Sequence, residues 1–596
     1  MTTFLKAARA TLAAIRFAGR FSRGRLAINF ALILFNGVVQ VMGVASIAPF
    51  LAVAGSEGSI PALGKVPLVG SWLASMAHRD LLIVMGFVTI LGLLTANFLM
   101  WLTERVRLRY GAFLIHALRE GLMVNYCARP YGYYLATNSS VLLKRLTHDT
   151  FQFVNGVLVP SLEIISRLVV LLLLLVLLLV VAPGITLLAA AFCGLIYGGS
   201  LAVLNSRGRR LGHQMNVAQR SMLQAAQQFF GAIKAILLHG KTEYFAGQFL
   251  DASAISTACS ARAGLLGNLP RYLLEPVAFG TLVGVVLVNA ANGVAMATIL
   301  PKLSILALAG YRLLPSFQAV YGQAMNVLSN VYSIGEVADC AHQDAAAVGP
   351  PQLPVHFTQS LRLDAVSFSY AGGMTPVIQD LSMDFPKYSK TGIIGPTGCG
   401  KSTLVDLILG LHSPTKGRIL VDGTPLATEN ITSWRALVGY VPQDIYLLDD
   451  TIAANIAFGI PEAKRDLKKL RQVADAAHIL AFVENKLPHG FATMVGERGV
   501  RLSGGQRQRI GIARALYHGP EILVLDEATS ALDAETEKDV MNAIYELSGK
   551  ITMIMIAHRR SSLNRCDRLF DLAAGSVMDS PAPKSLGGIH DLTHPK

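Results

Sequence analysis

Charged residues are scarce in this sequence. Only 15% of its 596 residues are Asp, Glu, Lys or Arg, whereas 52% are hydrophobic and the mean hydropathy is +0.47. Soluble globular domains carry about 25% charged residues, so this composition excludes a wholly soluble chain. Because single hydrophobic cores stop growing near roughly 250–300 residues, we expect at least two domains, one of them in a membrane.

Cysteine is also rare, and its spacing gives no sign of a metal site. The six cysteines form no CxxC pair, which excludes zinc ribbons and gives no sign of a disulfide framework. They are Cys127, Cys193, Cys259, Cys340, Cys399 and Cys566. We expect free thiols and no zinc.

A basic stripe for nucleic acid is missing, although the net charge is +14. Residues 1–340 carry a net charge of +15 and the remainder −1, so the positive excess belongs to the apolar part of the chain. That distribution is typical of cytoplasmic loops that face anionic lipid headgroups. We therefore expect a membrane partner and no nucleic acid.

Long apolar stretches dominate the first 320 residues. A membrane helix needs about 20 predominantly apolar residues, and six stretches meet this requirement. They lie near 26–53, 80–103, 157–182, 184–205, 272–291 and 294–318. Lys and Arg crowd the N-terminus, Arg105–Arg145 and Arg207–Arg262, which predicts that these segments and both termini are cytoplasmic.

The two long cytoplasmic segments carry apolar residues at helical spacing, so we expect helices that extend well beyond the membrane. Pro130–Tyr134 and Gly240–Phe245 interrupt them and are candidate docking turns for a second domain, with ordinary helix packing as the alternative. Ala, Gly, Pro and Gln then mark a linker at Ala345–Pro354.

An α/β domain is expected after this linker. Short β-branched runs such as 391–394, 419–421, 522–525 and 551–556 alternate with helical segments, which predicts a largely parallel sheet. The fold class is thus a six-helix membrane domain with long cytoplasmic extensions, over 1–340, followed by an α/β P-loop domain over 355–590.

A phosphate-binding loop follows the first of these strands. The motif GxxxxGK[ST] stands between an apolar strand and a helix, where its backbone N–H groups and the helix N-terminus favour an anion. Its residues are Gly395, Pro396, Thr397, Gly398, Cys399, Gly400, Lys401, Ser402 and Thr403. We expect Lys401 to reach the β- and γ-phosphates of a nucleotide and Ser402 to bind Mg²⁺.

A second strand, Ile522–Leu525, ends in two adjacent carboxylates, Asp526 and Glu527. Successive side chains of a strand point to opposite faces, so the two acids are expected to have different roles. Asp526 suits the Mg²⁺ shell, and Glu527 suits polarisation of the attacking water.

The segment Leu502–Gln506, with Ser503, Gly504, Gly505 and Gln506, matches the signature motif of ABC ATPases. With six apolar stretches before this domain, the whole chain resembles an ABC exporter half-transporter. The resemblance implies ATP and Mg²⁺ as ligands and a second, identical half-transporter as partner, because the signature motif closes on ATP held by the other subunit.

Further positions take roles from the same resemblance. Tyr370 is similar to the aromatic residue that stacks on adenine, with a core tyrosine as the alternative. Gln443 resembles the glutamine that senses Mg²⁺ and the attacking water. Asp533 resembles the acid that couples the two sites, and His558 resembles the switch histidine at the γ-phosphate. Glu527, His558 and Gln443 are therefore the expected catalytic residues.

Basic residues in the apolar stretches point to the substrate. Arg167, Arg271, Glu275, Lys302 and Arg312 are charged side chains that usually face a cavity or a partner. Arg271 and Arg167 could instead pair with Glu275 and Glu163, four residues away. Arg271, Lys302 and Arg312 are the candidate ligands for an anionic substrate.

The segments around Arg271 and Arg312 resemble bacterial lipid-linked oligosaccharide flippases of the protein N-glycosylation pathway. This resemblance implies a flippase, an ATP-hydrolysing translocase for an anionic lipid-linked saccharide in the bacterial inner membrane. Exporters of other lipids, drugs or peptides and an ATP-gated channel share the same ATPase motifs and stay open as alternatives.

Overall fold

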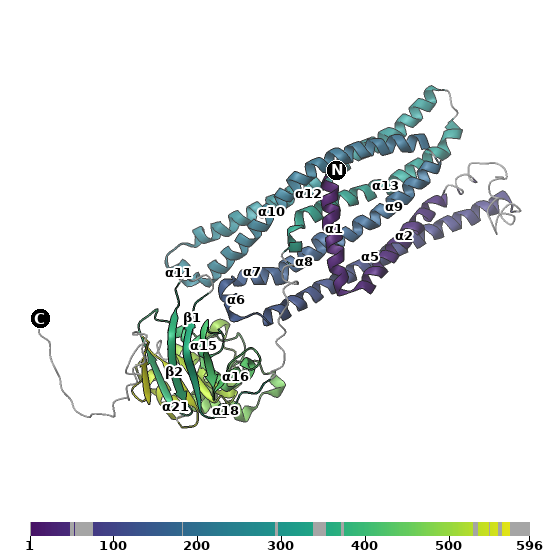
Figure 1. The fold of residues 1–596 in the computed structure, drawn as a ribbon. Coiled ribbons are helices and arrows are strands. Elements are labelled where there is room, and N and C mark those ends of the chain that lie inside the picture. The colour runs from purple at the N-terminus through teal and green to yellow at the C-terminus, as the bar shows by residue number, and fades with distance from the viewer. Residues whose placement is uncertain are drawn as a thin grey trace, which may run out of the picture. The chain divides into compact units, whose positions relative to one another are not determined.

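The computed structural model describes residues 2–47, 76–181, 183–292, 296–335, 353–370, 375–528, 534–546, 549–557 and 563–572, together with Phe50, Val53 and Val337. The chain forms two compact units. The first comprises Met1–Arg129 and Tyr134–Ala346, and the second comprises Ala347–Lys596 with Pro130–Tyr133. Long helices build the first unit, and strands flanked by shorter helices build the second (Figure 1).

The first unit is entirely helical over the residues described. Its longest helices have about 50 residues, or roughly 75 Å at 1.5 Å per residue, which is more than twice the length that crosses a bilayer. The helices are α1 (Thr2–Phe21), α2 (Arg23–Ala45), α5 (His78–Cys127), α6 (Tyr131–Ala136), α7 (Ser139–Lys144), α8 (Thr150–Gln152), α9 (Val159–Val181), α10 (Pro183–Gly231), α11 (Ile233–Leu238), α12 (Thr242–Ala291) and α13 (Met296–Asn330). The expected helical extensions are confirmed.

The six predicted apolar stretches fall on α2, α5, α9, α10, α12 and α13. Within the described part of the chain, three segments are long and apolar enough to cross a membrane: Arg23–Gly43, His78–Cys127 and Ser139–Leu179. Along α5, an exposed stripe of large apolar side chains recurs every three or four residues, as a lipid-facing helix requires. The stripe is Phe87, Leu91, Leu94, Phe98 and Trp101.

Packing in the first unit joins helices that are distant in sequence. α10 lies along α12, α13 packs on α9 and α12, and α2 packs on α5 and α9. Phe17 of α1, Leu114 of α5 and Val327 of α13 share one buried cluster with Phe153. Two π-helical turns, η2 (Arg145–Asp149) and η3 (Phe153–Leu158), lie between α7 and α9, and η3 contributes Phe153 to this cluster.

The second unit contains two sheets. A parallel sheet has the strand order β6-β7-β8-β3-β9, and an antiparallel sheet has the order β2-β1-β4-β5. The strands are β1 (Ser360–Phe368), β2 (Ile378–Pro386), β3 (Lys390–Ile394), β4 (Lys416–Val421), β5 (Thr424–Pro425), β6 (Val438–Val441), β7 (Ile522–Asp526), β8 (Thr552–Ile556) and β9 (Arg568–Asp571). The expectation of a parallel sheet is correct for 391–394, 522–525 and 551–556.

For 419–421 that expectation is wrong, because β4 pairs antiparallel with β1. A short β-branched run predicts a strand but not the direction of its partner, which here is set by residues about 60 positions earlier. Asp422 follows β4 and accepts hydrogen bonds from the backbone N–H groups of Thr358, Gln359 and Ser360 at 2.5, 2.7 and 2.9 Å, which hold the start of β1 at the end of β4.

Helix α15 lies between the two sheets. Its Leu404 and Ile408 are fully buried in one cluster with Leu361 of β1 and Val524 of β7. The helices of this unit are α15 (Lys401–Ile408), α16 (Ile431–Leu437), α17 (Ile452–Ile456), α18 (Leu467–Ala476), α19 (Leu480–Lys486), α20 (Gly504–Tyr517) and α21 (Ala534–Glu546). Burial of α15 on both sides fixes the position of the loop that precedes it.

Candidate active site

The predicted phosphate loop connects β3 to α15, as the motif requires. Gly398 and Gly400 have φ values of +85° and +97°, a backbone conformation that a side chain would strain, so glycine is needed at both positions. The Lys401 Nζ donates hydrogen bonds to the carbonyl oxygens of Gly395 and Pro396, at 2.7 and 3.1 Å. Lys401 therefore lies folded over the loop, and Ser402 beside it is exposed.

The two adjacent carboxylates at the end of β7 contact different partners. Asp526 Oδ2 accepts a hydrogen bond from the Tyr440 hydroxyl at 3.4 Å, whereas Glu527 Oε2 accepts one from Gln443 Nε2 at 2.8 Å. Glu527 has a φ of +49°, which is uncommon for a residue other than glycine. The two acids thus have different hydrogen-bond partners, and their division between Mg²⁺ binding and polarisation of water stays a prediction.

Gln443 comes two residues after β6, which pairs with β7, so the adjacent strand ends bring Gln443 to Glu527. Burial first, and then the neighbouring Glu527 charge, raise the pKa of Asp526, while Tyr440 and the Lys401 charge oppose that rise. The structure therefore gathers Lys401, Gln443, Asp526 and Glu527 at the carboxyl end of the parallel sheet.

Two residues at this edge were not identified from the sequence. Burial, followed by the Asp526 charge, raises the pKa of Asp406 on α15 to about 6. Tyr440 is the hydroxyl partner of Asp526, and within the β6 run Val438–Val441 it looks like an ordinary core aromatic. Asp406 and Tyr440 belong to no recognisable sequence motif. They come to the site because of the way α15 and β6 pack, which the sequence alone does not show.

The signature motif begins α20. Ser503 caps this 14-residue helix: its hydroxyl accepts from the Gln506 N–H at 3.3 Å, and the Gln506 side chain accepts from the Ser503 N–H at 2.9 Å. Ser503 itself is exposed. Among the described residues, no hydrogen bond links Ser503–Gln506 to the phosphate loop 395–403.

The body of α20 is joined to the loop that carries Gln443. Arg514 donates to the carbonyl oxygens of Tyr446 and Asn455, each at 2.8 Å. Gly511 lies against Ile445, and a Cβ at position 511 would overlap the Ile445 side chain. These contacts leave no space between the signature helix and the segment two residues beyond Gln443.

Tyr370 lies just after β1 and contacts the phosphate-loop helix. The residue is 39% exposed, its hydroxyl is 3.0 Å from Thr403 Oγ1, and its ring packs edge-on against Phe368. Stacking of Tyr370 on adenine stays a prediction. Asp533 and His558 lie outside the described residues, although β8, which precedes His558, ends between β7 and β3.

Two of the candidate charged residues of the membrane unit, Arg167 and Arg271, are each paired with an acid. Arg271 Nε is 2.9 Å from Glu275 Oε1 on α12, and Arg167 is 3.6 Å from Glu163. Lys302 and Arg312 belong to α13, but their side chains lie outside the described set. The pairing of Arg271 was one of the two interpretations that the sequence allowed.

The oxygen atoms at the phosphate loop fit Mg²⁺ better than a transition metal. Ser402, Gln443 and Asp526 offer a hydroxyl, an amide carbonyl and a carboxylate, which are hard ligands. Over the residues described, no group of three or more His, Cys, Asp or Glu could hold a metal by itself. Such a sparse set suits an ion that keeps several waters and shares a nucleotide's phosphate oxygens.

The fold and this edge of the sheet together define a membrane protein with a P-loop ATPase domain. A family model described as "ABC transporter" matches residues 378–530. The heterocyst differentiation ATP-binding protein HepA of Nostoc sp. is 31% identical over 457 residues, which are 75% of this chain and 72% of that protein. The ATP-dependent lipid A-core flippase of Dechloromonas aromatica is 30% identical over 563 residues, 91% and 90% of the two chains.

A solved structure supports the same assignment of the fold. A bacterial Atm1-family ABC exporter with ATP bound superposes with a TM-score of 0.74 at 23% identity, covering 94% of this chain and 95% of that one. The chain belongs to the ABC transporter family, as an exporter half-transporter whose ATPase is coupled to transport. It unites a helical membrane domain with an ABC nucleotide-binding domain that binds ATP.

Proposed function

We propose that two copies of this chain form a homodimer that uses ATP and Mg²⁺ to move an anionic lipid-linked saccharide from the inner to the outer leaflet of the bacterial inner membrane. In this proposal the membrane domain spans 1–340, the nucleotide-binding domain spans 355–590, and both termini are cytoplasmic. ATP binding closes the two nucleotide-binding domains, and hydrolysis separates them again.

The arrangement of Gln443, Glu527 and Asp526 carries the hydrolytic part of the proposal. Glu527 is placed to polarise the attacking water and accept its proton, and Gln443, 2.8 Å from it, orients that carboxylate. Lys401 would stabilise charge on the β- and γ-phosphates. Mg²⁺, held by Ser402, Gln443 and Asp526, would supply charge neutralisation at the phosphates.

Replacing Glu527 tests this assignment. We expect Glu527→Gln to lower ATP turnover by at least about 100-fold, the usual size of a lost general base, while ATP binding persists because the phosphate contacts remain. Turnover is measured as phosphate release and binding with a fluorescent ATP analogue. Glu429→Gln is the matched control, because Glu429 is exposed. Unchanged phosphate release by Glu527→Gln would refute the assignment of Glu527 as the residue that polarises the attacking water.

The dimer is supported by the position of the signature motif. Ser503 is exposed at the N-terminus of α20, where backbone N–H groups and the helix dipole favour an anion. The same chain's phosphate loop makes no hydrogen bond with this motif among the residues described. A second copy would supply the missing half of each nucleotide site.

The substrate class is supported by the relatives and by the membrane charges. Several relatives that align with most of this chain are named as ATP-dependent lipid A-core flippases, which favours a lipid. Arg271, Lys302 and Arg312 are the proposed contacts for the anionic part. Because Arg271 is paired with Glu275, a phosphate would have to displace that carboxylate.

Leaflet-resolved transport in proteoliposomes tests the substrate. We expect fluorescent polyprenyl-diphosphate saccharides to change leaflet only with ATP, and Arg271→Ala with Arg312→Ala to impair this transport more than basal hydrolysis. Equal loss of both activities would make these arginines structural. ATP-dependent movement of drugs, peptides or simple phospholipids, but not of the saccharide lipid, would favour the other exporter classes, and ATP binding without any movement would favour a channel.

A further inference from the structure

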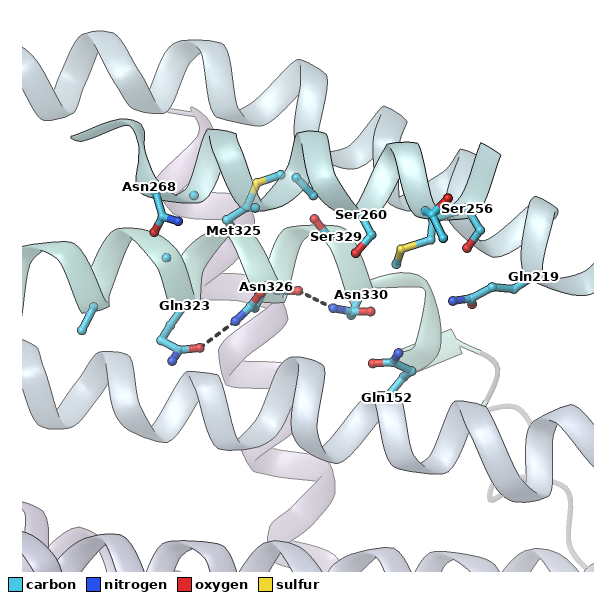
Figure 2. A pocket seen from close by; sticks show the side chains of 17 residues that line it. Gln152, Gln219, Ser256, Ser260, Asn268, Gln323, Met325, Asn326, Ser329 and Asn330 are labelled. Carbon is cyan, nitrogen blue, oxygen red and sulfur yellow. Dashed lines mark hydrogen bonds between the residues drawn. The ribbon is translucent and has the colours of Figure 1, made fainter. Parts of the chain in front are cut away.

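A neutral polar cavity that is open to solvent on one side lies in the first unit. It has a volume of about 630 Å³ and is lined by α10, α12 and α13, with one residue from α8. That volume is within the range of roughly 300–1,000 Å³ typical of small-molecule sites. Figure 2 shows side chains from these helices pointing toward the same space.

The lining has amides and hydroxyls but no Asp, Glu, Lys or Arg. Six side-chain amides line the cavity: Gln152, Gln219, Asn268, Gln323, Asn326 and Asn330. Four hydroxyls join them: Ser256, Thr257, Ser260 and Ser329. Amides and hydroxyls both donate and accept hydrogen bonds, so this lining matches a neutral group with many hydroxyls or amides and gives a phosphate no counter-charge.

One row of amides on α13 has a fixed orientation. Gln323 Nε2 donates to the carboxylate of Glu163 at 2.9 Å, and its Oε1 accepts from Asn326 Nδ2 at 3.0 Å. Asn330 Nδ2 in turn donates to the backbone oxygen of Asn326 at 2.9 Å (Figure 2). The Glu163 carboxylate accepts from Gln323 and the Asn326 carbonyl oxygen accepts from Asn330, so neither amide is reversed, and Asn330 Oδ1 is left without a partner.

Two buried atoms of the lining have no hydrogen-bond partner. Asn330 Oδ1 and Ser329 Oγ belong to residues that are only 8% and 7% exposed. A buried polar atom without a partner costs roughly 1–3 kcal/mol, a cost that a ligand offering hydroxyl or N–H donors would remove. The two unpaired atoms therefore favour a ligand with many hydrogen-bond donors.

Glycines widen the cavity without being needed for helix packing. A Cβ at Gly264 would meet no atom within 4 Å, and one at Gly322 would approach only the Gly267 oxygen, at 4.0 Å. By contrast, a Cβ at Gly156, which does not line the cavity, would lie 2.7 Å from the Asn330 side chain. Gly264 and Gly322 thus leave room for a bulky ligand rather than for a neighbouring helix.

We propose that this cavity binds the neutral saccharide portion of the transported lipid, separately from the basic residues that take its diphosphate. The inference rests on the proposed function, because a saccharide lipid is the substrate that presents both chemistries in one molecule. The hydroxyls and N-acetyl N–H groups of the sugar would donate to Asn330 Oδ1 and Ser329 Oγ.

The test compares two lipids on the full-length protein in nanodiscs. Polyprenyl diphosphate carrying N-acetylglucosamine and the same lipid without sugar are titrated, and the apparent affinity of each is read from ATPase stimulation. We expect the wild-type protein to prefer the sugar-bearing lipid, and Gly264→Leu and Asn330→Leu to reduce the ratio of the two affinities by about tenfold.

Gly247→Leu is the matched control, because Gly247 is also in α12, its Cβ would also meet no atom within 4 Å, and it does not line the cavity. It should keep the wild-type ratio. A wild-type ratio in both Gly264→Leu and Asn330→Leu would overturn the inference.

A second measurement separates this inference from the proposed function. If neither lipid stimulates the wild-type ATPase, the proposed lipid-linked substrate is wrong. Calorimetric titration with the free N-acetylglucosamine trisaccharide then tests separately whether the cavity binds a saccharide. Binding that is lost in Gly264→Leu but kept in Gly247→Leu supports a saccharide site. Absence of binding to the wild-type protein refutes it.

Discussion

Lys144 and Asp149 are a pair of charges buried almost completely in the membrane unit, with side chains 3% and 1% exposed. Lys144 Nζ is 2.6 Å from Asp149 Oδ1 and 2.9 Å from Asn216 Oδ1 on α10. The pair spans the π-helical turn η2, and π turns are frequent at functional sites. It therefore ties this irregular part of the chain to α10.

Replacing one member of this ion pair should lower the stability of the protein more than replacing both members. We expect Lys144→Met to destabilise the protein by about 3–5 kcal/mol, because Asp149 is left as a buried charge without its cation. Thermal unfolding in detergent measures the loss. The double variant Lys144→Met with Asp149→Leu should recover most of the stability, and a double variant as unstable as the single one would contradict this account.

At the scale of elements, the contact between β1 and β4 depends on Asp422. Burial would raise the pKa of Asp422, but the hydrogen bonds from Thr358, Gln359 and Ser360 outweigh burial and lower it. A carboxylate whose pKa is lower in the folded than in the unfolded state stabilises the fold above its unfolded pKa. That contribution disappears as the pH falls below about 4.

We expect Asp422→Asn to destabilise the second unit by about 1–3 kcal/mol at pH 7, since hydrogen bonds to a charged acceptor become weaker neutral ones. The difference from wild type should shrink as the pH falls from about 4 to 3. Pulse proteolysis in urea on the full chain measures this difference, with Asp364→Asn on β1, whose side chain pairs with Arg418, as control. A difference that is independent of pH would mean that the charge of Asp422 is unimportant.

Much at this scale could be predicted from the sequence, because it follows from local patterns. Runs of apolar residues identify α2, α5 and α9, and the motif at 395–403 places a loop between β3 and α15. The antiparallel pairing of β4 could not be predicted, since it depends on β1 far along the chain. The partners Tyr440 and Asp406 were missed for the same reason, whereas Gln443 and Glu527 were found through their motifs.

At the scale of the whole molecule, the proposal requires that each nucleotide site be shared between two chains. Lys401→Ala removes the cation of one half-site. Gly505→Glu adds an anion at the N-terminus of α20, where it favours the helix but repels phosphate. Each variant alone should lack ATPase activity because both of its sites are damaged.

Coexpression of these two variants with different tags tests the shared site. A mixed dimer keeps one intact site, so a statistical mixture should recover about a quarter of the wild-type ATPase rate if the sites act independently. Purified mixed dimers, each with one intact site of two, should show about half of the wild-type rate and are assayed beside each parent. A mixed dimer as inactive as its parents would contradict sharing, and so would full activity of a monomer.

The close approach of Gly511 to Ile445 also constrains how this domain can diverge. A methyl group at position 511 has space only when the Ile445 side chain turns away or residue 445 becomes smaller, so the two positions should tend to change together among related chains. We expect Ala at 511 to occur with Val or Ala at 445, and the combination of a large residue at both positions to be rare in an alignment of homologues.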